Sequence, residues 1–108
     1  MRKKTTTTTK SPMTVLHETK LVDRHQGRLT RIFEFNEKKF KLIYDLRNGG
    51  SDLSVYIMDL NGEFKFILNK YDIGYSFGVS YVSYEEDKEK DIVKAIKLSD
   101  EVISKIYG

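Results

Sequence analysis

From Leu29 onward, hydrophobic and polar residues alternate with a period of two, which is typical of strands that bury one face. Residues 28–46 read RLTRIFEFNEKKFKLIYDL and predict a hairpin that turns at Glu37-Lys38. A two-residue loop there sets Phe33 opposite Leu42, and the other bulky residues of both strands fall on the same side.

Three further turns are predicted, at RNGGSD (47–52), at the dipeptide Asn61-Gly62 and at KYDI (70–73). With these turns Phe33, Phe40 and Phe66 share one face of the sheet. A slip of one residue at any turn would move a strand's whole apolar set to the other face. We therefore predict a five-stranded antiparallel meander over about residues 29–84.

A helix is predicted over about residues 85–107, where apolar residues recur close to the helical period. Ser83 and Glu86 have capping-box spacing at its start, and Ser99 could divide it into two helices. An apolar sheet face needs a cover, so we expect the helix to lie on it. The fold class is α+β.

The other face of the sheet is predicted to be polar, apart from one apolar row. That row contains Ile32, Ile43, Tyr56, Ile67 and Ser76. Residues 14–26 fit neither period, and they are open between an irregular strand and a short amphipathic helix. Either this segment folds back over the row, or the row is a docking strip, because exposed apolar patches on monomers are usually interaction sites.

The chain of 108 residues is long enough for one domain, which we assign to residues 14–108. Residues 1–13 read MRKKTTTTTKSPM and predict a flexible, disordered basic tail. Residues 1–16 contain four basic residues and no acidic one. The overall charge of +3 therefore leaves the rest of the chain close to neutral. The body lacks the general basic field of an obligate nucleic-acid binder.

Catalytic and metal-binding motifs are not found in the sequence. There is no cysteine, and His17 and His25 have no partner at zinc spacing, so we expect no metal site. No phosphate-binding glycine loop and no nucleophile elbow occur, so we expect no cofactor and no enzymatic activity. An enzyme would need a pocket that the sequence does not reveal.

The first functional hypothesis is a small non-catalytic regulatory module, of inhibitor or adaptor type, that docks on another protein. It could also form a homodimer through the outer row or a free edge strand. The expected contact residues are Ile43, Arg47, Tyr56, Met58 and Ile67. We expect no membrane contact and a cytoplasmic location. The small size and the Lys-, Tyr- and Ile-rich sequence suggest a viral, phage or mobile-element origin, and the location would then be the host cytoplasm.

The alternative is a protein that binds single-stranded DNA or RNA through the tail and the first hairpin, since such proteins combine basic grooves with aromatic residues. The candidate residues are Arg2, Lys3, Lys4, Lys10, Arg28, Lys39 and Lys41. The predicted register weakens this hypothesis, because it places most of the aromatic residues under the helix and leaves only Tyr56 on the outer face.

Overall fold

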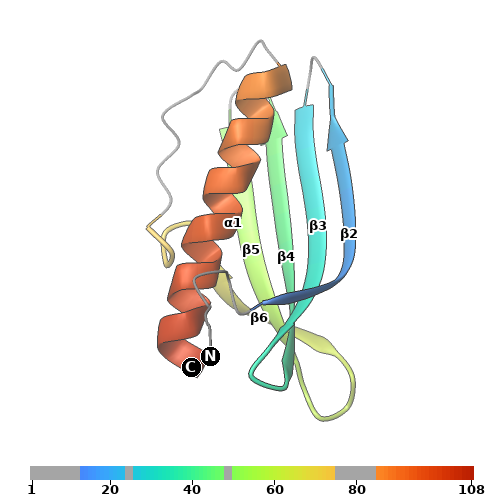
Figure 1. Ribbon diagram of the computed structural model, residues 1–108, viewed down its shortest axis with the longest axis vertical. Coiled ribbons are helices and arrows are strands. Elements are labelled where there is room, and N and C mark those ends of the chain that lie inside the picture. The colour runs from blue at the N-terminus through green and yellow to red at the C-terminus, as the bar shows by residue number, and fades with distance from the viewer. Residues whose placement is uncertain (1–12, 24–25, 48–49, 75–84) are drawn as a thin grey trace, which may run out of the picture.

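The computed structural model describes residues 13–23, 26–47, 50–74 and 85–108. Its elements are β2 (Thr14–Val22), β3 (Gln26–Phe35), β4 (Lys38–Arg47), β5 (Gly50–Met58), β6 (Phe64–Asn69) and α1 (Glu85–Tyr107). The five strands lie in chain order in one antiparallel sheet, and α1 packs across one face of it (Figure 1). The predicted α+β meander with a C-terminal helix is thus confirmed.

The strands that form the sheet differ from those predicted. Residues 14–22 are the edge strand β2 beside β3, so the strand alternative for this segment is correct. The helix alternative and the lid over the outer face are wrong. The strand predicted beyond Gly74 falls mainly on residues 75–84, which lie outside the described residues, as do residues 1–12 of the predicted tail.

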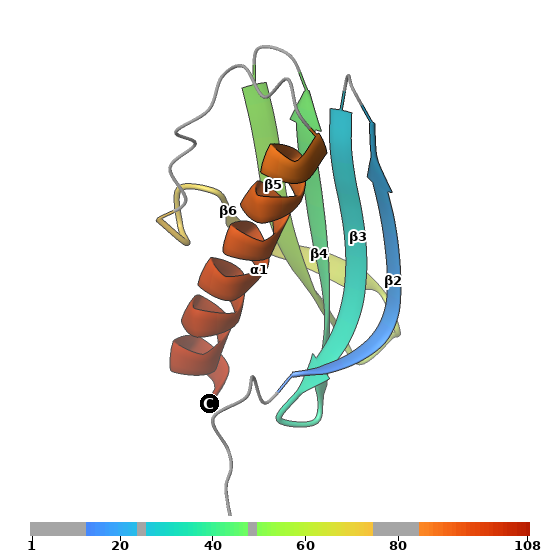
Figure 2. The ribbon, with the colours of Figure 1, turned by 45° about the horizontal axis from the view of Figure 1, so that its top comes forward.

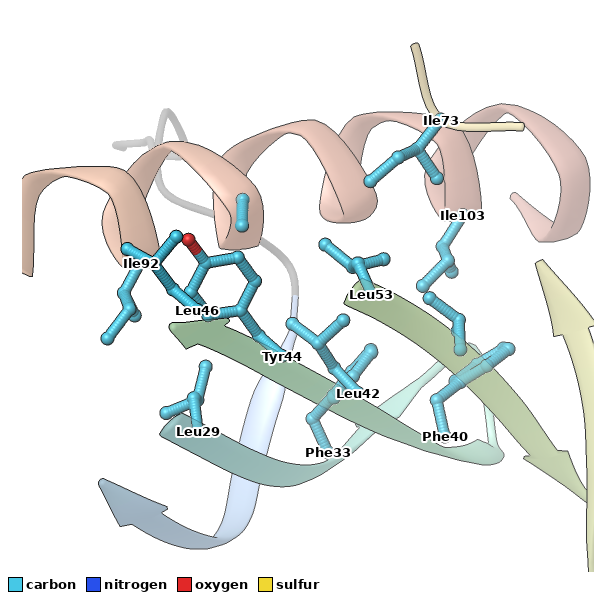
Figure 3. Packing of buried hydrophobic residues seen from close by; sticks show 12 residues of the cluster. Leu29, Phe33, Phe40, Leu42, Tyr44, Leu46, Leu53, Ile73, Ile92 and Ile103 are labelled. Atoms are coloured by element: carbon cyan, nitrogen blue, oxygen red, sulfur yellow. The ribbon is translucent and has the colours of Figure 1, made fainter. Parts of the chain in front are cut away.

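The core lies between α1 and the sheet face that it covers, which we call the inner face (Figure 3). Its buried members on the sheet are Leu29, Phe33, Phe40, Leu42, Tyr44, Leu46, Leu53 and Val55, and those on α1 are Ile92, Ala95 and Ile103. Ile73, in the turn after β6, is also buried in this cluster. The side chain and main chain of Asn69 fold this turn: its Oδ1 accepts from the backbone N–H of Tyr71 at 2.9 Å.

Polar contacts fix α1 on the inner face. The Arg31 guanidinium donates to Asp100 Oδ1 at 2.9 Å, and the Tyr44 hydroxyl donates to the Asp91 carboxylate. The predicted break at Ser99 does not occur, since α1 is continuous there. The Ser99 hydroxyl instead donates to a backbone carbonyl within the helix.

The turn between β3 and β4 is formed by Asn36-Glu37 and not by Glu37-Lys38. Both turn residues have positive φ, 52° and 66°, as a type I′ turn requires. Phe33 therefore pairs with Phe40. The predicted register was wrong by two residues, but a shift of two leaves each side chain on its predicted face. The same shift occurs between β4 and β5.

The turn between β5 and β6 is a three-residue loop, Leu60–Gly62, in which Gly62 has a φ of 82°. The predicted two-residue turn at Asn61-Gly62 is wrong. The register then shifts along β6, because Val55 pairs with Leu68 while Tyr56 pairs with Phe66. Ile67 is the extra residue of this β-bulge.

The three-residue turn places Phe66 on the opposite face from Phe33 and Phe40, and the bulge returns Leu68 to the inner face. The prediction that the three phenylalanines share a face is therefore wrong for Phe66. Phe64 lies on this other face too, because it pairs with Met58. We call this other face, opposite α1, the outer face.

Candidate functional site

Three aromatic residues and one lysine gather on the outer face, and we call them the aromatic patch: Lys41, Tyr56, Phe64 and Phe66. The Tyr56 and Phe66 rings meet edge to face, with centroids 5.9 Å apart. The Lys41 Nζ lies 5.4 Å from the centroid of Tyr56 and 4.7 Å from that of Phe64. The ammonium thus lies over two rings, a favourable cation–π arrangement.

Strand pairing positions this patch. Lys41 lies on β4 directly opposite Tyr56 of β5, and Tyr56 lies opposite Phe66 of β6. The three-residue turn Leu60–Gly62 brings Phe66 into this row, and the bulge at Ile67 then returns Leu68 to its place opposite Val55. Because the three strands hydrogen-bond to one another, the patch is held by the sheet and not by a loop.

The aromatic patch is open to solvent. Phe66 is 54% exposed, while Tyr56, Phe64 and Lys41 are partly buried against one another. Figure 2 shows α1 lying against the inner face only, and no described helix or strand lies over the outer face. An exposed phenylalanine within a rigid aromatic group is typical of an anchor for a partner.

The structure separates the residues that were predicted to contact a partner. Tyr56 belongs to the aromatic patch, and Met58 borders it opposite Phe64. Ile43 is partly buried on the outer face, opposite Ser54. Ile67 packs against the core instead of joining the outer row. Arg47 ends β4 opposite Gly50 and lies six residues along the strand from Lys41.

The predicted apolar row is also interrupted. Ile32 pairs with Lys41, and Ile43 pairs with Thr30, so the two isoleucines lie diagonally and not side by side. Sequence reasoning missed Phe64 and Phe66 as outer-face residues because it assumed a regular β6. The alternation of Phe64, Lys65 and Phe66 was a correct signal for a shared face, but it could not say which face.

The predicted nucleic-acid residues do not form one basic surface in the described structure. Arg28 pairs with Asp45 at 3.7 Å, and Lys39 lies opposite Glu34. Lys41 belongs to the aromatic patch. Arg28 and Lys39 lie at opposite ends of the β3–β4 pair. The tail residues Arg2, Lys3, Lys4 and Lys10 lie outside the described residues.

Charges on the outer face nearly balance. The register places the basic residues Arg28, Lys39, Lys41 and Arg47 on this face, and the acidic residues Glu34, Asp45 and Asp52. With four basic and three acidic positions, this face produces no strong field for a polyanion.

Beside Met58 there is a shallow hollow of about 510 Å³. Met58 and Leu60 supply its apolar lining, and charged residues of the β3–β4 and β5–β6 turns surround them. It extends the apolar surface of the outer face towards these two turns.

Neither a cluster of metal ligands nor a membrane-spanning helix occurs in the described ranges. Within them no three His, Cys, Asp or Glu side chains gather as metal ligands would. His17 is exposed on β2, with its Nε2 3.1 Å from the Thr19 hydroxyl, and His25 lies outside the described residues. In the same ranges no helix combines the length and the apolar character that spanning a bilayer requires.

Comparison of this chain with protein-family models, with curated proteins and with solved structures gives no significant match. The fold defines the class of the protein, an α+β protein with a meander sheet and one covering helix.

Proposed function

We propose that this protein is a small non-catalytic module that docks on another protein through the aromatic patch. The observation that carries the proposal is the position of Phe66, half exposed on a rigid sheet face and held edge to face by Tyr56. Aromatic residues and Met are enriched in the centres of protein interfaces, where lysine is depleted.

The chemistry of the patch indicates the kind of partner. Docking would bury Phe66 and remove water from the Lys41 ammonium. A partner that presents an apolar side chain to Phe66 and a carboxylate to Lys41 would satisfy both requirements. The mixed charge of the outer face, with basic and acidic positions in nearly equal numbers, fits such a surface better than a polyanion.

The test is substitution of Phe66, which is exposed and is therefore not needed for the core. We expect Phe66→Ser to lower affinity for the partner about tenfold or more, as loss of an interface anchor does. The control is Tyr71→Ser, because Tyr71 is 78% exposed in the turn after β6 and lies outside the patch.

The experiment begins with capture from a native lysate on immobilised wild type, Phe66→Ser and Tyr71→Ser, followed by titration of the purified partner. Wild type and Tyr71→Ser should retain the partner and Phe66→Ser should lose it. Equal capture by all three forms would contradict the proposal. A double substitution of Ile43 and Ile67 by lysine would not be a suitable test of docking, because Ile67 packs against the core and its replacement would disturb the fold.

The second candidate function is binding of single-stranded nucleic acid. It is favoured by one observation: Phe64 and Phe66 lie on the open face with Lys41, where bases could stack on them. Binding to a labelled oligonucleotide should then weaken as salt increases, with a linear slope of log affinity against log salt. Absence of that slope would remove this candidate.

Non-catalytic action and the cytoplasmic location remain part of the first proposal and are drawn from the sequence. A protein partner that is found only in the cytoplasm would support the location.

A further inference from the structure

The strand β2 forms one edge of the described sheet and is covered very little. It pairs with β3 on one side only, and eight of its nine residues, all but Val22, are exposed. Val15, Leu16 and Leu21 are large apolar residues on this edge, each about half exposed. The free edge of a strand presents unpaired backbone N–H and C=O groups, which are a template for another strand.

We propose that a second copy of this chain occupies this edge, with the two β2 strands antiparallel and their twofold axis at Thr19. In this register Glu18 lies opposite Lys20 of the second copy, and Lys20 lies opposite its Glu18. Opposite charges that face each other across antiparallel strands stabilise the pairing.

Neighbouring registers that keep the same faces together are disfavoured. An axis at Glu18 would place the two Glu18 carboxylates opposite each other. An axis at Lys20 would do the same with the two ammonium groups. Like charges directly opposite are destabilising, so the charge pattern of β2 selects the axis at Thr19.

The local geometry of β2 leaves a regular segment for this pairing. Its register against β3 shifts between Val15 and His17, with Leu16 as the extra residue, and is regular from His17 to Val22. Glu18 and Lys20 both face the side of α1, because they pair with Arg31 and Leu29 of the inner face.

Lys20 already has one carboxylate partner at this edge. Its Nζ donates to Glu89 of α1 at 2.8 Å. The hydrogen bond and the charge of Glu89 raise the pKa of Lys20. An ammonium has three N–H donors and can donate to a second carboxylate, so Glu18 of the second copy would extend this pair into a network.

The arrangement makes the dimer bivalent. Two identical strands that pair antiparallel in one sheet are related by an axis perpendicular to that sheet. Both helices would then lie on one side of a continuous sheet, and both aromatic patches on the other. The dimer itself rests on β2 alone and not on the function proposed for the patch.

The test uses charge reversal at the two paired positions, with sedimentation velocity over the micromolar to millimolar range. Wild type should dimerise in a concentration-dependent manner. Glu18→Lys alone, or Lys20→Glu alone, places like charges opposite each other at two symmetric positions and should weaken dimerisation about tenfold or more.

An equimolar mixture of the two single variants should form heterodimers. One chain then carries lysine at both paired positions and the other carries glutamate at both, so every facing pair has opposite charges. Misfolding of either variant would not be corrected by mixing. Glu63→Lys, which makes the same charge change at the β5–β6 turn, is the matched control and should dimerise as wild type does.

Three results would overturn the inference: a monomeric wild type throughout this range, single variants that dimerise as wild type does, or a mixture that stays monomeric. Phe66→Ser should dimerise normally. Failure of the aromatic patch and failure of the β2 pairing are therefore seen in different variants.

Discussion

At the scale of single residues, one buried charge with a defined partner is the Arg31 guanidinium. Arg31 is 5% exposed, and its guanidinium carbon lies 4.6 Å from the centroid of the Phe33 ring. Its close ionic partner is Asp100 of α1, at 2.9 Å, while Glu18 lies further away at 3.9 Å. A buried charge needs such a partner, because desolvation is not compensated otherwise.

Loss of Asp100 should therefore destabilise the fold strongly. We expect Asp100→Ala to lower the free energy of unfolding by about 3 kcal/mol, the lower end for a broken buried pair, since Glu18 partly compensates. Glu101→Ala, the exposed neighbour, should change it by less than about 0.5 kcal/mol. Urea denaturation of both variants measures the difference, and equal losses would contradict this role of the pair.

At the scale of elements, the turns decide how the strands align. Glu37 has a φ of 66° in the β3–β4 turn, where a residue with a Cβ is strained. Asn-Gly is the preferred type I′ pair, so Glu37→Gly should stabilise the protein by about 0.5–1 kcal/mol. Leu60→Gly is the control, since Leu60 is exposed and does not have positive φ.

The control should lose about 0.5–1 kcal/mol, because glycine there adds only freedom to the unfolded chain. Thermal unfolding of the two variants beside wild type provides the comparison. If Glu37→Gly instead destabilised the protein, the positive φ of Glu37 would not be a source of strain in this turn.

The β5–β6 turn should respond to acid. Asp59 Oδ1 accepts from the backbone N–H groups of Glu63 and Asn61, both at 2.9 Å. These two hydrogen bonds lower the pKa of Asp59, and the one from Glu63 contributes more. Because the pKa of Asp59 is lower in the folded state, its ionised carboxylate stabilises the turn at pH values above the ordinary aspartate pKa of about 3.9. This stabilisation is lost as the pH falls through the pKa that Asp59 has in the folded state.

We expect amide exchange at Asn61 and Glu63 to accelerate, relative to the intrinsic rate, only below about pH 4. Asp59→Asn keeps an acceptor oxygen but no titrating group, so it should remove this pH dependence. Hydrogen exchange followed by NMR measures it. Retention of the acid transition in Asp59→Asn would assign it to another group.

The same elements explain what the sequence could predict. The alternation predicted the faces of β3, β4 and β5 correctly, since registers that differ by two residues keep the same faces. The pattern therefore could not choose between a turn at Asn36-Glu37 and one at Glu37-Lys38.

Both larger errors fall on β-bulges, which add one residue and invert the alternation. Leu16 interrupts β2, and residues 14–26 consequently fitted neither period. In β6 the three-residue turn and the bulge at Ile67 together invert the faces of residues 64–66, so Phe66 was missed as the centre of the candidate site. The residues of β6 give no sequence signal of this inversion.

At the scale of the whole molecule, α1 and the sheet complete one core. Phe40 of β4 meets Tyr107 near the end of α1, with ring centroids 5.2 Å apart, and the Asn36 side chain donates to the Tyr107 carbonyl at 2.7 Å. Apart from Ile73 in the turn after β6, and Met13, the described residues that cover this core come from α1 and the sheet alone. We therefore expect the helix and the sheet to unfold together.

Two isoleucines three residues apart on α1 test this cooperativity. Ile103 is fully buried against the sheet, whereas Ile106 is 54% exposed. Ile103→Ala should lower the free energy of unfolding by about 2–5 kcal/mol, and Ile106→Ala by less than about 1 kcal/mol. Far-ultraviolet circular dichroism reports mainly on α1, and the fluorescence of tyrosines such as Tyr44 and Tyr56 reports on the sheet. The two signals should shift together in Ile103→Ala, because neither layer can keep its apolar face in water alone. Separate transitions would show that the sheet is stable without its helix, and its inner face would then be a second surface open to a partner.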